Sequence, residues 1–75
     1  MITMNLVVVE VFKTNVKRER DANMLSCLLV EKYPEIKVSF DLEDCDKVLR
    51  IEGVDIDAKY VIALMLSNGF YCCEL

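Results

Sequence analysis

The sequence predicts a single α+β domain, residues 1–75, in which two helices alternate with four strands. A chain of 75 residues is long enough for one domain with one small core. Apolar residues make up 55% of it and charged residues 29%, which indicates a compact globular chain rather than a disordered one. The spacing of the apolar residues changes along the chain in the order strand, helix, strand, strand, helix, strand.

The first half of the chain predicts a strand, a helix and a second strand. Residues 6–13 are β-branched and almost continuously apolar, as expected of a central strand. Residues 18–33 repeat apolar side chains every three or four positions, and Pro34 ends this helix. Residues 36–42 alternate apolar and polar side chains, which is typical of a half-buried strand. The inward face of the helix is predicted to hold Ala22, Leu25, Leu28, Leu29 and either Lys32 or Tyr33.

An acidic turn and a third strand follow. The run EDCD, residues 43–46, predicts a polar hairpin tip, because it lacks the glycine and the distal glutamate of a calcium loop. Residues 47–52 alternate again, and Gly53 ends this strand.

The second helix has signals at both ends. Asp55 or Asp57 caps its first amides, and Asn68 with Gly69 stops it, since both tolerate the left-handed conformation at a helix end. Residues 70–75 then form a short last strand. The inward face of this helix is predicted to hold Val61, Leu64, Met65 and Asn68.

Two strand–helix–strand halves in this order pack into a four-stranded antiparallel sheet. Right-handed crossovers place both helices on one face of that sheet. The predicted architecture is therefore the ferredoxin-like βαββαβ sandwich. Because this fold hosts many unrelated functions, function has to be argued from particular residues.

Composition and charge exclude several function classes. A net charge of −4 repels phosphate backbones, so we expect no nucleic-acid partner. The chain has no histidine, no serine beside a recognisable base and no glycine-rich phosphate cradle, so we predict neither an enzyme nor a cofactor. The apolar N-terminal segment is interrupted at Glu10, lacks a basic leader, and is shorter than the roughly 20 residues of a membrane span. We expect a soluble, cytoplasmic protein without a membrane partner.

Four cysteines, Cys27, Cys45, Cys72 and Cys73, are expected to be reduced in that compartment. Each is predicted to be buried or half-buried, since a free cysteine packs like a small hydrophobe. The adjacent Cys72 and Cys73 point to opposite faces of a strand and therefore do not share a metal ion.

The valine-rich first strand predicts self-association. Val7, Val8, Val9 and Val11 make it apolar on both sides, whereas the helices cover only one side of the sheet. We expect a homodimer to bury the row of valines that the helices leave uncovered. The two copies would pack sheet against sheet or add strand to strand at an edge. The alternative is a modest patch softened by long neighbours such as Arg50.

Three stretches of the chain, together with the length of the first helix, carry a resemblance to a known protein family. They are FKTNV (12–16), DLEDCDKVLRIEG (41–53) and VIALMLSNGF (61–70). Together they resemble the heavy-metal-associated domain of copper chaperones and metal-pumping ATPases, over nearly the whole chain. In that family the first strand runs into an M-x-C-x-x-C loop, whose two thiolates hold Cu(I) or a similar soft ion.

The resemblance places Val16 at the methionine position, Arg18 at the first cysteine and Asp21 at the second. Arg18 offers no lone pair and stays charged, and Asp21 is a hard oxygen ligand where a soft ion needs sulfur. The resemblance therefore implies a degenerate member that has lost its metal site. It also implies that Phe70 packs under this loop.

Two hypotheses follow for function. In the first, the chain is a small non-catalytic interaction module, in which Lys17, Arg18 and Arg20 beside the helix amides bind an anion or an acidic protein surface. A simpler interpretation is that these charges only solvate the helix start. In the second, a metal site has moved to Cys45, which joins another thiol across a homodimer. Four slowly reacting thiols would favour the first hypothesis, and a fast Cys45 that copper protects would favour the second.

Overall fold

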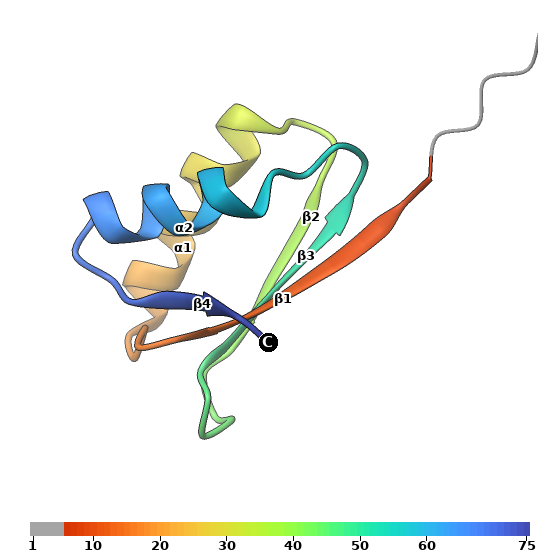
Figure 1. Cartoon of the computed structure of the whole chain (residues 1–75). Helices are drawn as coiled ribbons and strands as arrows, with labels where there is room; N and C mark the ends of the chain where they lie inside the picture. Colours follow the sequence, from red (N-terminus) through yellow and green to blue (C-terminus); the bar gives the residue numbers. More distant parts are fainter. Residues whose placement is uncertain (1–5) are drawn as a thin grey trace, which may run out of the picture.

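The computed structural model describes residues 6–75, and its elements follow one another in the predicted order (Figure 1). They are β1 (Val8–Thr14), α1 (Glu19–Lys32), β2 (Lys37–Asp41), β3 (Val48–Gly53), α2 (Ala58–Ser67) and β4 (Cys72–Glu74). No bound differs by more than two residues from the corresponding strand or helix inferred from periodicity.

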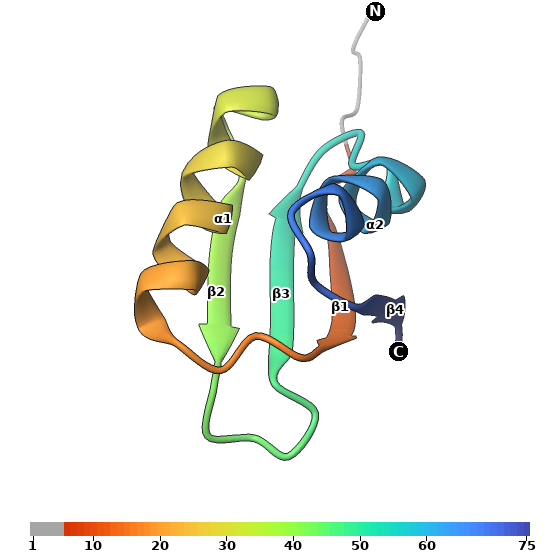
Figure 2. The ribbon, with the colours of Figure 1, turned by 90° about the vertical axis from the view of Figure 1, so that its left-hand side faces the viewer.

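The four strands form one antiparallel sheet in the order β2-β3-β1-β4. Both helices lie on the same face of this sheet, as the two views show (Figures 1 and 2). The ferredoxin-like sandwich is therefore confirmed. Neither helix in the described range is both long and apolar enough to cross a membrane.

The core lies between the sheet and the two helices, because strand residues that face each other across a ladder share a face. Phe12 of β1 pairs with Leu49 of β3, and Leu49 pairs in turn with Phe40 of β2. This row points toward the helices. The largest fully buried side chains are Phe12, Leu25, Leu29, Leu49, Ile51, Met65, Val16 and Val61.

Asp57, rather than Asp55, caps α2. Its side chain accepts a hydrogen bond from the backbone amide of Lys59 at 2.9 Å. Asp55 instead has a positive φ of 57° and forms part of the turn before the helix. Gly69 ends α2 in the left-handed region with a φ of 87°, as its predicted role required.

Three residues of the predicted helix faces are less buried than expected. Leu28 and Leu64 are half-buried beside the groove between α1 and α2. Asn68 is exposed, and its prediction as an inward residue is wrong. Its side-chain amide turns back to donate a hydrogen bond to the Leu64 carbonyl at 2.8 Å, which satisfies an acceptor at the helix end instead of filling the core.

Candidate binding site at the β1–α1 loop

The loop between β1 and α1 is fixed to the core at its centre. Val16 is fully buried, as expected for the position that the resemblance assigns to it. Just before it, the buried Thr14 hydroxyl donates to the Lys47 carbonyl at 2.6 Å and accepts from the Val16 amide at 3.2 Å. These contacts give the loop one conformation and tie it to the start of β3.

The α2–β4 connection braces the loop from a second side. The Asn15 side chain accepts a hydrogen bond from the Tyr71 amide at 2.8 Å. This contact brings the half-buried Phe70, which packs on the core, next to the loop. The position agrees with the expectation that Phe70 packs beneath it.

The α1 helix begins without a side-chain cap. Arg18 stands at the cap position with extended backbone and forms no capping hydrogen bond through its side chain. Its carbonyl accepts from the amides of Asp21 and Ala22, both at 3.1 Å. Within residues 6–75, the amides of Glu19 and Arg20 form no hydrogen bond. Two helix donors are thus left for solvent or a ligand.

The three basic residues of the predicted site lie at this helix start. Lys17, Arg18 and Arg20 are all exposed, and none forms an ion pair with another residue in the range 6–75. Glu19 and Asp21 add two carboxylates in the first turn, where the helix dipole favours negative charge. The structure thus brings together the residues that the sequence singled out, with mixed charge.

The acidic hairpin between β2 and β3 lies at the same end of the sandwich (Figure 2). Its carboxylates hold the turn together: Asp41 accepts from the amides of Glu43 and Asp44 at 3.3 Å each. Asp46 also forms an ion pair with Lys13 at 3.6 Å. The interpretation of this segment as a polar hairpin tip agrees with these contacts.

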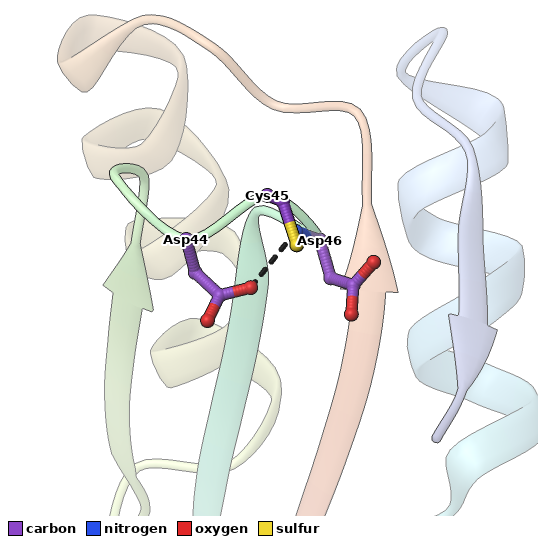
Figure 3. Close-up of side chains that lie close together, drawn as sticks. All are labelled: Asp44, Cys45 and Asp46. Atoms are coloured by element: carbon purple, nitrogen blue, oxygen red, sulfur yellow. Dashed lines mark hydrogen bonds between the residues drawn. The ribbon is translucent and has the colours of Figure 1, made fainter.

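Cys45 stands at the tip of this hairpin between two acids (Figure 3). One ligand atom each from Asp44, Cys45 and Asp46 lies within 4.8 Å of the others. The Asp44 carboxylate already accepts from the Asp46 amide at 2.8 Å, the dashed line in Figure 3. Cys45 is the only sulfur in this cluster, whereas a soft ion needs at least a second one.

The expected burial of the cysteines is wrong for two of the four. Cys27 and Cys45 are exposed, the first on α1 away from its buried face and the second in the hairpin. Cys72 and Cys73 do point to opposite faces, since they pair with the buried Thr14 and the exposed Lys13.

Cys72 is chemically silent at neutral pH. Burial raises the pKa of its thiol to about 12, and electrostatic interactions with the neighbouring Cys73 and Glu74 add to this effect. Because the thiolate is the form that binds metals and attacks electrophiles, Cys72 serves as a core side chain.

Comparisons with known proteins add no further guide. No protein-family model, curated protein or solved structure matches this chain.

The helix amides beside the three basic residues were part of the sequence prediction, and one other feature was missed. A groove of about 550 Å³ also lies at the other end of the sandwich, lined by residues such as Tyr33, Ile36 and Val54. In the sequence, this groove is marked only by Pro34 and Gly53, which end the neighbouring helix and strand.

Proposed function

We propose that this domain is a small non-catalytic binding module, related to heavy-metal-associated domains, that binds an acidic segment of a partner protein at the β1–α1 loop. One observation carries the proposal: α1 starts without a cap, and three exposed basic side chains without an ion pair stand around its free amides. The loop offers no nucleophile beside a base, so its chemistry is recognition.

A carboxylate of the partner would satisfy what the helix start lacks. The amides of Glu19 and Arg20 can donate to its oxygens, and the guanidinium of Arg18 or Arg20 can hold it in a two-pronged contact. The helix dipole contributes about 0.3–1 kcal/mol at an exposed site, so each such contact is weak. A partner with several acidic residues is therefore expected, rather than a single small anion.

A titration with a glutamate-rich peptide tests this proposal. The peptide is expected to shift the backbone amide NMR signals of Glu19 and Arg20, and Arg18→Glu with Arg20→Glu should abolish binding. A control of equal net charge is Lys37→Glu with Lys59→Glu, two exposed lysines on β2 and α2. Equal loss of binding in both variants would mean unspecific attraction and would refute the site.

The proposed relation to metal-binding domains has its own test. Arg18→Cys with Asp21→Cys is expected to create Cu(I) binding, because the buried Val16 still holds the loop. The unmodified protein should lose Cu(I) to a chelator that a two-thiolate site outcompetes. A folded double variant that binds no copper would contradict the relation.

A metal site at Cys45, completed by another thiol across a homodimer, is the second candidate, and the exposure of Cys45 at the hairpin tip favours it. Since Cys27 is also exposed, thiol reactivity alone does not separate the hypotheses. The test is whether Cu(I) protects Cys45 from alkylation while leaving Cys27 reactive. Under the main proposal copper protects neither. We also place the domain in the cytoplasm, where its four free thiols stay reduced.

A further inference from the structure

The N-terminal half of β1 has a free edge. Within residues 6–75, β4 pairs only with Phe12–Thr14, and a last hydrogen bond joins the Leu75 amide to the Val11 carbonyl at 2.9 Å. Figure 1 shows β4 beside one part of β1, while the rest of β1 continues past it. Val8–Glu10 therefore pairs with β3 on one side and has no strand on the other, and Leu6 and Val7 extend beyond the end of this pairing.

The backbone groups at this edge have a defined direction. The bond from Leu75 shows that the carbonyl of Val11 points toward β4 rather than toward β3. In an antiparallel ladder, alternate residues point both backbone groups to the same side. The amide and carbonyl of Val9 thus point outward at the free edge, and those of Val7 would do so when the strand is continued by one residue; none of the described residues pairs with them.

The other outer edge, on β2, differs in its side chains. Lys37 and Asp41 stand at the two ends of that short strand and are both exposed. Charges on an edge strand oppose pairing with another chain. The start of β1 and the two residues before it carry no charge from Leu6 to Val9, and Leu6 and Val7 are 71% and 65% exposed.

We propose that a second copy of this chain pairs its own β1 with this edge, antiparallel, with Val8 opposite the partner's Val8. In this register Val9 faces the partner's Val7, and these two residues exchange the outward-pointing backbone hydrogen bonds. The same bonds recur on the other side of the twofold axis. Two four-stranded sheets become one continuous sheet.

This stretch complements itself in length and in charge. Five residues, 6–10, are free, and the register uses all five of each copy without reaching Leu75. At the three central positions an exposed valine meets another exposed valine. The acidic Glu10 meets the partner's Leu6, so no two carboxylates face each other across the pair. A charged strand of a different protein would lack this match.

Stacking of the open sheet faces is less favourable. The row that contains Val9 continues through Glu52 to Lys37, and the row of Val11 continues through Arg50. Face-to-face contact would remove these charged groups from water, at a cost that the valines do not offset. The edge contact leaves them solvated. It is small, in the class below about 1,200 Å² of buried surface, so the dimer is expected to be weak.

Sedimentation of the full chain over a range of concentrations tests the association, at about 0.15 M salt to screen the net charge of each copy. Val8→Lys should weaken dimerisation at least about tenfold, because two ammonium groups then meet at the axis. Val30→Lys is the matched control, since Val30 and Val8 are 39% and 38% exposed. A chain that stays monomeric throughout, or equal weakening by both variants, would overturn the proposal.

The register is tested by cross-linking. Val8→Cys, in a protein with Cys27, Cys45 and Cys73 changed to serine, is expected to form a disulfide dimer on mild oxidation, because directly opposite side chains lie close. Val30→Cys in the same background should remain monomeric. Val7→Pro removes one outward amide without a bond inside the sheet and should also weaken the dimer. A dimer in which Val8→Cys fails to cross-link would show a different interface.

Discussion

Thr14 is the one buried polar side chain of the described core, and both of its hydrogen-bonding roles are filled. Thr14→Val keeps the shape but leaves the Val16 amide and the Lys47 carbonyl without partners. Unfolding in urea is expected to show a loss of about 1–3 kcal/mol. Thr14→Ser, which keeps the hydroxyl, should lose clearly less. Equal stability of the valine variant would mean that water replaces both bonds.

Gly53 is required by a close approach of the chain to itself. A Cβ atom at this position would lie 2.8 Å from Cγ2 of Ile36. Gly53→Ala is therefore expected to cost about 1–3 kcal/mol in thermal or urea unfolding. In an Ile36→Ala background the same change should cost much less, because the clashing methyl group is gone. Equal costs in both backgrounds would locate the strain elsewhere.

Glu10 and Glu74 introduce a pH dependence where β1 and β4 meet. A hydrogen bond with the Glu74 carboxyl group raises the pKa of Glu10 above its ordinary value of 4.5, and burial and the negative charge of Glu74 act in the same direction. Because the pKa of Glu10 is raised in the folded state, protonation of Glu10 stabilises the fold at pH values below about 4.5. This contribution is lost as the pH rises through the pKa of the folded state.

The variant Glu10→Gln should therefore stabilise the protein at pH values near neutrality and bring no gain in acid. The gain is expected to stay below about 1 kcal/mol, since Glu10 is only half-buried and solvent screens its charge. Melting temperatures of both proteins across the acid range measure it. A constant difference at every pH would show that packing, and not charge, is responsible.

At the level of elements, apolar periodicity predicted the helices and strands well. The stripe Ala22, Leu25 and Leu29 is buried as the three-and-four spacing requires. The same spacing places Cys27 outside the buried stripe. The prediction that Cys27 is buried followed the general tendency of cysteine instead, and it is wrong. Asn68 was misplaced because a helix end is governed by unpaired carbonyls rather than by periodicity.

Leu29 and Leu64 were both predicted to face the core, but they differ in burial. Leu29 is fully buried on α1, so Leu29→Ala is expected to cost about 2–5 kcal/mol, close to the whole stability of so small a domain. Leu64 is only half-buried on α2, and Leu64→Ala should cost clearly less. Urea unfolding of both variants measures the difference. A larger loss at Leu64 would mean that the groove between the helices closes in solution.

At the scale of the whole molecule, the order of elements was enough to place the β1–α1 loop and the acidic hairpin at one end. The contacts that define the candidate site were not predictable in this way. The pairing of Asn15 with Tyr71 joins residues 56 positions apart, and the hydrogen bond from Thr14 to Lys47 joins residues 33 positions apart. Such features arise from tertiary packing and leave no local pattern.

The place of β1 between β3 and β4 also affects how the chain folds. Both neighbours follow it by more than 30 positions in the sequence, so β1 is made first and pairs last. Until then its valines are accessible to other unfolded chains, and aggregation competes with folding. Recovery of native protein after dilution from urea should thus fall with concentration, and Val8→Lys should raise it more than Val30→Lys does. The apolar edge of the folded protein would then be the part of the nascent chain that depends most on a chaperone.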